Sequence, residues 1–262
     1  MASLAPNTLP ILYNELVPLN RNQHANFKVR KIDGLERLAS VHAVPLTIDE
    51  FSMAQRHFPI VFSAGDNPLP IALMGLHEGT NTFFNEKGQV RDPNLYVPAY
   101  LRRFPFLLAR LREDTDELSL CFDPTADTIG EDIDGEPLFD GDQPSEATKA
   151  VLQFCEQFEQ AAQRTQAFMN ELAAAGLLME GEVAIQPEGL EQPFIYRGFK
   201  MVDEEKFHNL RGDELRKLNQ NGMLPLIMGH LFSLLVIREV FGRQVMQGTG
   251  PVPAPEPATA EA

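Results

Sequence analysis

Two tyrosines and two arginines lie close together in the first half of the chain. Tyr96, Tyr100, Arg102 and Arg103 fall within eight residues, beside several phenylalanines. Arginine offers a bidentate fork to carboxylates and tyrosine offers a stacking surface, so the cluster predicts a site for a peptide or protein partner. The alternative is that both arginines pair with the acidic segment that follows them. Because adjacent residues of a helix point about 100° apart, the two arginines are not expected to share a contact.

The six histidines form no recognised catalytic or metal-binding motif. Phosphate-binding glycine loops, the nucleophile elbow and the zincin motif are absent from the sequence. His42 and His230 remain candidates for a functional role, although His230 lies among apolar residues, where a histidine is more often bonded to a backbone carbonyl. We therefore expect no metal and no cofactor.

The acidic residues are concentrated in one segment. The chain has a net charge of −15, and 13 acids with no Lys or Arg fall between Glu113 and Glu146. The remainder is nearly neutral, and a phosphate backbone binds basic surfaces, so a nucleic-acid partner is not expected. The segment does not fit a calcium loop, because glycines occupy the positions of both essential acids. Loose binding of divalent cations is an alternative to a solvated loop.

A cytoplasmic location is expected from the N-terminus and from the apolar runs. No basic region followed by an apolar core precedes the rest of the chain, as a signal peptide would require. The longest apolar stretch, Met223–Ile237, has 15 residues, whereas a membrane span needs about 20. It predicts a buried helix and no integral membrane span. Cys155 is expected in the core, and two cysteines fit a reducing compartment.

The first half of the sequence has mainly strand patterns. Strands are predicted near residues 27–31, 41–46, 60–62, 69–76 and 118–122, with a hairpin over 80–91. Thr47 and Glu50 form a capping box that begins a helix over 48–57, with Phe51, Ala54 and Phe58 facing inward. A second helix is predicted over Val97–Arg112, kinked at Pro105. The acidic residues 123–143 are expected to form a surface loop.

The second half has mainly helix patterns. Apolar residues three or four apart predict a long helix over Ser145–Ala175, closed by Gly176. Two short strands, two short helices and a final helix over Pro225–Val245 follow. The pattern predicts an α+β fold, with a largely antiparallel sheet in the N-terminal half and helices concentrated in the C-terminal half. We expect an extended arm over 1–22, a single domain over 23–246 and a disordered tail over 247–262.

Four segments resemble the bacterial SapC family. They are Val44–Leu46 with Phe58–Phe62, then Tyr96–Phe106, then Gly229–Leu234, and their order and spacing cover roughly residues 10 to 245. The resemblance implies links to surface layers, to peptide transport or to gene neighbourhoods with outer-membrane receptors. It supplies no catalytic residues. A transport-permease role conflicts with the predicted lack of a spanning segment.

These observations favour a non-catalytic cytoplasmic accessory protein that binds a peptide or protein partner. The main alternative is an enzyme that modifies a peptide or amino acid at an unrecognised site, which would include His42 or His230. A structural protein of the surface layer is a third hypothesis, and it would require export.

Overall fold

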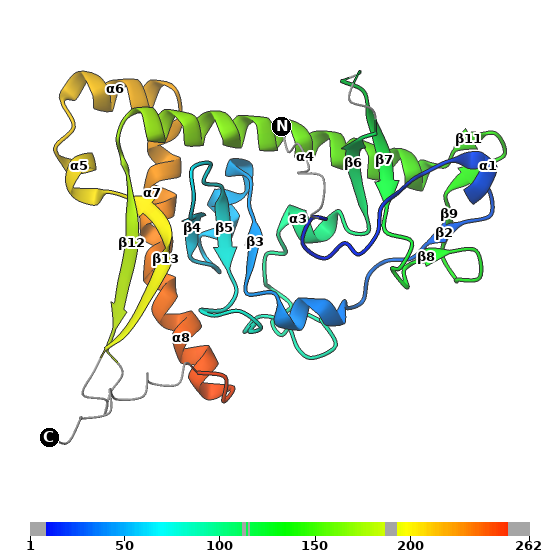
Figure 1. Ribbon diagram of the computed structural model, residues 1–262, viewed down its shortest axis with the longest axis horizontal. Coiled ribbons are helices and arrows are strands. Elements are labelled where there is room, and N and C mark those ends of the chain that lie inside the picture. The colour runs from blue at the N-terminus through cyan, green and yellow to red at the C-terminus, as the bar shows by residue number, and fades with distance from the viewer. Residues whose placement is uncertain (1–8, 112–113, 115, 187–192, 251–262) are drawn as a thin grey trace, which may run out of the picture.

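Two sheet regions lie side by side and a long helix spans both (Figure 1). The computed structural model describes residues 9–111, 114, 116–186 and 193–250. Antiparallel sheets lie mostly in the N-terminal half and the longest helices in the C-terminal half, so the predicted α+β class is confirmed. Buried apolar residues from both sheet regions form one continuous core cluster.

The largest sheet has five antiparallel strands in the order β12-β13-β4-β5-β3. Its first-half strands are β3 (Ala43–Pro45), β4 (Ile60–Ser63) and β5 (Pro70–Leu73). Its other strands, β12 (Leu178–Ile185) and β13 (Phe194–Val202), come from the second half, and β13 joins β4. The Phe199 ring lies directly against Gly181 of β12, and a side chain at this position would collide with the ring. The sheet therefore combines segments far apart in the sequence.

The second region consists of short strands. In one sheet β7 (Leu118–Phe122) lies between β1 (Val17–Pro18) and β6 (Phe106–Arg110). In another, β2 (Lys28–Val29) lies between β8 (Ile129–Gly130) and β9 (Glu136–Pro137), while β10 (Phe139–Asp140) pairs with β11 (Gln143–Pro144). The strand predicted at 118–122 is confirmed as β7, whereas residues 123–143, predicted as a loop, contribute further short strands.

The helices of the first half are short. They are α1 (Arg21–His24), η1 (Glu36–Ser40), η2 (Ile48–Glu50), α2 (Phe51–Ala54) and α3 (Ala99–Arg102). The predicted helix over 97–112 is wrong beyond Arg103. A cis Phe104–Pro105 bond follows α3, and Phe106–Arg110 is a strand because it pairs with β7 along its whole length. Helix-favouring Leu and Ala are overridden by this pairing.

The helices of the second half are longer. They are α4 (Glu146–Ala174), α5 (Glu204–His208), α6 (Gly212–Gln220), α7 (Met223–Ser233), η3 (Leu234–Val236) and α8 (Ile237–Met246). Gly176 follows α4 with a positive φ of 67°, as predicted, and Ser145, predicted as the first helical residue, is instead the N-cap. α4 contacts β6 and β11 of one region and η2 of the other. It therefore holds the two regions together.

The N-terminal residues that the structure describes are docked on the body. Leu12 and Tyr13 are buried, and the Tyr13 hydroxyl donates to the Phe106 carbonyl at 2.8 Å. The predicted arm thus contributes to the core from residue 12 onward. Of the predicted tail, residues 251–262 lie outside the described residues.

Candidate functional site

The carboxylate of Glu50 organises the region around the predicted tyrosine and arginine cluster. This buried side chain accepts hydrogen bonds from the Thr47 amide at 2.9 Å and the Thr47 hydroxyl at 2.8 Å. It also accepts from the Ala99 amide at 2.6 Å and the Tyr96 hydroxyl at 3.0 Å. One residue of the predicted capping box thus joins the start of η2 to the start of α3 and fixes the Tyr96 ring.

Arg102 lies on an aromatic surface at the outside of this junction. Its guanidinium is 5.8 Å from the centroid of the Tyr96 ring and 5.1 Å from that of Phe154, on α4. One guanidinium nitrogen donates to the Tyr96 hydroxyl at 3.4 Å. The side chain is exposed, and it forms no ion pair with any carboxylate that the structure describes. Most of its donors are therefore available to an external acceptor.

Arg103 points into the interior between α3 and α4. Its guanidinium lies 4.6 Å from the Tyr100 ring centroid and 4.2 Å from that of Phe158, one turn after Phe154. It faces the Glu159 carboxylate at 3.5 Å, and its buried Nε has no hydrogen-bond partner. The ion pair is long and leaves one nitrogen without a partner, and the guanidinium also lies over two rings.

The four predicted residues therefore lie in two separate arrangements. Tyr96 pairs with Arg102 outside, whereas Tyr100 pairs with Arg103 inside, and the Tyr100 hydroxyl donates to the Ile11 carbonyl at 2.9 Å. The two tyrosines do not form one aromatic wall around both arginines. The acidic partner of Arg103 belongs to α4 and not to the acidic segment.

Burial and charge set the protonation of the groups around the arginines. Burial, together with the nearby Glu50 carboxylate, raises the pKa of Tyr96 to about 12. The phenol is therefore protonated at neutral pH and donates to Glu50. Burial also raises the pKa of Glu159, and the Arg103 guanidinium opposes that change.

His230 of α7 bridges two strands of the large sheet. The ring is buried: its Nε2 accepts from the Val202 amide at 3.0 Å, and its Nδ1 donates to the Ile60 carbonyl at 2.8 Å. One turn later, the Ser233 hydroxyl accepts from the Ile60 amide at 2.9 Å. Burial lowers the pKa of His230 to about 4. Both ring nitrogens are thus used by the backbone, and the ring is neutral at physiological pH.

His42 lies in a different environment, near the start of β3. Burial lowers its pKa, while Glu78 opposes this effect and His77 adds to it. The exposed His77 bonds the Thr80 hydroxyl at 2.7 Å and the Gln244 amide at 3.2 Å. The two predicted histidines are therefore not brought together in one site.

A family model of SapC matches residues 19–240. The chain belongs to the SapC family. The matched region includes the Glu50 junction, both arginines and His230. Comparison with curated proteins and with solved structures finds no match.

The acidic segment of this SapC protein is partly neutralised by arginines from the first 40 residues. Arg21 pairs with Asp142, and Arg30 pairs with Asp127 at 2.8 Å. Asp123 is buried; despite this burial, hydrogen bonds from Thr125 and the Asn14 amide hold its pKa low. Glu113 lies outside the described residues. Within the residues that the structure does describe, no group of three or more His, Cys, Asp or Glu side chains could hold a metal ion.

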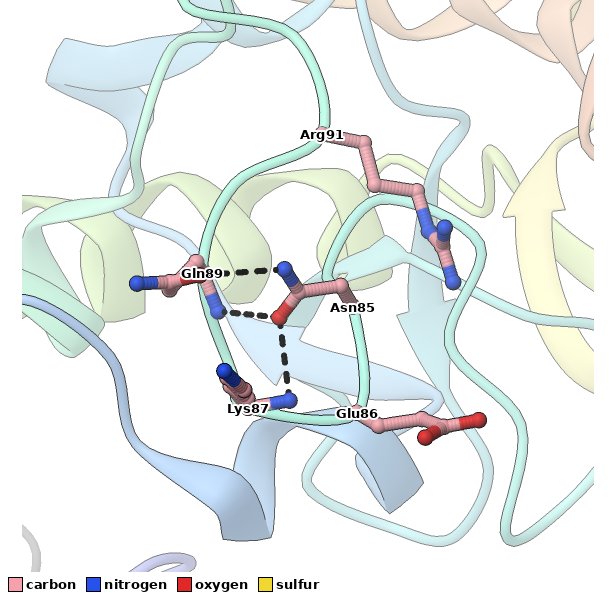
Figure 2. A pocket seen from close by; sticks show the side chains of 5 residues that line it. All are labelled: Asn85, Glu86, Lys87, Gln89 and Arg91. Carbon is pink, nitrogen blue, oxygen red and sulfur yellow. Dashed lines mark hydrogen bonds between the residues drawn. The ribbon is translucent and has the colours of Figure 1, made fainter.

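Two surface hollows lie apart from Arg102 and Arg103. Figure 2 shows the first, of about 290 Å³, beside the turn at Asn85–Arg91. The Asn85 side chain accepts from the amides of Lys87 and Gln89 at 3.0 and 2.9 Å, so it stabilises the turn itself. The second, of about 240 Å³, lies between the end of α4 and α6. Neither hollow contains a predicted site residue.

Sequence reasoning missed three participants in the Arg102 and Arg103 arrangements. Phe154 and Phe158 were assigned to the core face of α4, and Glu50 only to a helix cap. The four-residue spacing places the two phenylalanine rings one helical turn apart on the same face of α4, where one lies under each arginine. That spacing was visible, but nothing local indicated that α3 would lie against them.

Proposed function

We propose that this SapC protein is a non-catalytic accessory protein that binds a peptide or protein partner at the surface formed by Tyr96, Arg102 and Phe154. The observation that carries the proposal is Arg102 itself. It is an exposed cation held over two rings, with donors left unused.

The chemistry of the partner follows from this geometry. A guanidinium presents parallel N–H groups that match a carboxylate. The two half-buried rings beside it favour an apolar neighbour of that carboxylate. We therefore expect a peptide with an acidic side chain or a free C-terminal carboxylate next to an apolar residue.

The alternative, an enzyme that modifies a peptide or amino acid, has less support. His230 spends both ring nitrogens on the backbone, and a general base needs a nitrogen within reach of its substrate. His42 is half-buried, and burial lowers the pKa of its ring. Among the residues that the structure describes, neither histidine lies with a nucleophile in an arrangement typical of covalent catalysis.

A cytoplasmic location is part of the same proposal, and one structural feature complicates it. Helices α7 to α8 form a 24-residue helix from Met223 to Met246, within which a stretch of 18 residues has a mean hydropathy of 1.7, so the helix is long and apolar enough to cross a membrane by composition alone. The sequence prediction considered only its 15-residue apolar part. What favours a folded core helix is the bonding of His230 and Ser233 to β4 and β13. A link to surface-layer, peptide-transport or outer-membrane receptor systems rests on the family alone.

A peptide-binding experiment tests the proposal. An immobilised library of peptides, each with a free and an amidated C-terminus, is screened with the wild-type protein. The tightest binder is then titrated against Arg102→Ala and Arg102→Lys. We expect Arg102→Ala to lose about thirtyfold in affinity, as is typical for an interfacial arginine, and Arg102→Lys to lose less because it keeps the charge.

Arg56→Ala is the matched control, since Arg56 is also an exposed arginine. It should bind as the wild type does. Equal affinities for the wild type and Arg102→Ala, with both proteins folded, would remove this surface from the proposal.

A further inference from the structure

The helix from Met223 to Met246 has two apolar faces, and only one is used inside the chain. The inner face bonds the sheet through His230 and Ser233 and buries Ile237. The opposite face is open: Phe232 is 59% exposed, Leu235 is 73% exposed and Met246 is 82% exposed. Large apolar side chains on the solvent side of an ordered helix often mark an interaction surface.

The exposed residues follow the spacing of a helix-pairing seam. We define the outer seam as the residues that follow one another along this face at alternating intervals of three and four positions. They are Pro225, Met228, Phe232, Leu235, Glu239, Gly242 and Met246. This alternation is the repeat by which two helices pack along their length. All members except Glu239 are uncharged, and the seam is about 32 Å long at 1.5 Å per residue.

Gly242 gives a second and independent indication of an external partner. It lies inside α8, where glycine destabilises a helix relative to alanine. A Cβ atom at this position would meet nothing within 4 Å, and the backbone there is not in the left-handed region. Nothing in the described part of the chain therefore requires a glycine at 242. A small residue on an exposed helix face does allow another helix to approach closely.

We propose that the outer seam binds the outer seam of a second copy of this chain, with the two helices antiparallel and the two-fold axis beside Leu235. In that register Leu235 meets its own counterpart, and Met228 lies opposite Gly242. Pro225 lies opposite Met246, and Phe232 lies opposite the aliphatic stem of Glu239. The long Met228 side chain then fills the space that Gly242 leaves, so the seam is complementary to itself.

A parallel pairing is disfavoured by the same residues. It would place Glu239 against Glu239 and Gly242 against Gly242, which combines charge repulsion with a void.

The distribution of charge favours a second copy over a lipid surface. The strands of the acidic segment lie at the opposite end of the long axis from α7 and α8 (Figure 1). Two copies can therefore pair without bringing these segments together. Glu239 in the seam balances Arg238 beside it, and the Arg243 guanidinium lies over the Phe83 ring, 4.6 Å from its centroid. A helix that lies on an anionic membrane instead directs an excess of basic residues toward the lipid. This inference is independent of the proposed peptide site.

Sedimentation velocity of the full chain, from about 1 to about 200 µM, tests the pairing; the seam is narrow, so we expect micromolar dissociation. Leu235→Glu and Phe232→Glu should give monomers at every concentration without a lower melting temperature. Leu118→Glu changes an exposed apolar residue at the other end of the molecule and should dimerise normally. Gly242→Leu should weaken the dimer while raising the melting temperature of the monomer.

Added cysteines on the seam test the register, since the chain's own Cys121 and Cys155 are buried. Leu235→Cys should form a disulfide-linked dimer on mild oxidation, whereas Gly242→Cys should not, because antiparallel pairing separates the two copies of residue 242. A monomeric wild type at 200 µM, or dimerisation unaffected by the Glu variants, would overturn the proposal. Cross-linking through Gly242→Cys and not through Leu235→Cys would overturn the antiparallel register. Flotation of a monomeric wild type with vesicles of neutral and anionic lipid would assign the seam to a membrane instead.

Discussion

Polar side chains enter the core at two junctions, and their hydrogen-bonding groups have partners to different degrees. At the junction of α7 with the large sheet, His230 and Ser233 bond the amide and the carbonyl of Ile60 in β4 and the amide of Val202 in β13. At the junction of α3 with α4, Arg103 keeps a buried Nε without a partner, and Arg102 keeps donors toward solvent. A buried polar group without a partner has an energetic cost.

This difference separates a structural junction from a candidate binding junction. The histidine, which sequence reasoning listed as a functional candidate, completes the sheet where β13 leaves β4. Within the described residues, these two strands pair directly at two positions, Phe199 with Ser63 and Lys200 with Phe62. The guanidinium groups of the two arginines have fewer hydrogen-bond partners, since Arg103 leaves one buried nitrogen unbonded and Arg102 is directed outward. Three experiments sharpen the comparison.

The largest effect is expected from removing the His230 ring. His230→Leu leaves the Val202 amide and the Ile60 carbonyl buried without partners, so we expect a loss of about 4 kcal/mol in the free energy of unfolding. Urea denaturation measures it. His208→Leu, at an exposed histidine, should stay within about 0.5 kcal/mol of the wild type. A small effect at His230 would mean that the junction is not held by these bonds.

The pH dependence of stability tests the same ring without replacing its bulk. Burial lowers the pKa of His230 from 6.5 to about 4, so between these values the unfolded chain binds a proton that the folded protein does not. Its contribution is complete above pH 6.5 and is lost as the pH falls toward 4, by roughly 3 kcal/mol. Denaturation series at several pH values should show a shallower slope in His230→Gln than in the wild type. Equal slopes would contradict a neutral buried ring.

The smallest effects distinguish the two arginines. Arg103→Met leaves the largely buried Glu159 carboxylate without its cation, and we expect a loss of about 2 kcal/mol. Arg102→Met should change stability by less than about 0.5 kcal/mol, because its side chain is exposed. Thermal denaturation of both variants measures the contrast. Equal destabilisation would show that Arg102 is as structural as its neighbour.

Much of the fold was predictable where the signals are local. The period of apolar residues in α4 and the glycine after its end were predicted correctly, as was the inward face of Phe51, Ala54 and Phe58. Such signals depend on residues within one or two turns of each other. The failure at 106–110 has the opposite origin, since the strand depends on β7, a partner that begins eight residues beyond its own end.

The candidate site was predictable in composition but not in arrangement. The sequence marks Tyr96, Tyr100 and the two arginines as a cluster, and helical geometry separates the directions of Arg102 and Arg103. Which arginine is buried depends on Phe154, Phe158 and Glu159, more than 50 residues later.

By itself, the sequence determined the α+β class, the period and the closing glycine of the long helix, the concentration of acids in one segment and the membership of the cluster. Only the tertiary structure decided that β13 joins β4, that His230 completes that junction and that Phe232 and Leu235 face outward. The reason is physical. Local patterns state which face of an element is apolar, whereas burial and hydrogen bonding depend on which distant element covers that face, and a helix with two apolar faces can have only one against its own sheet.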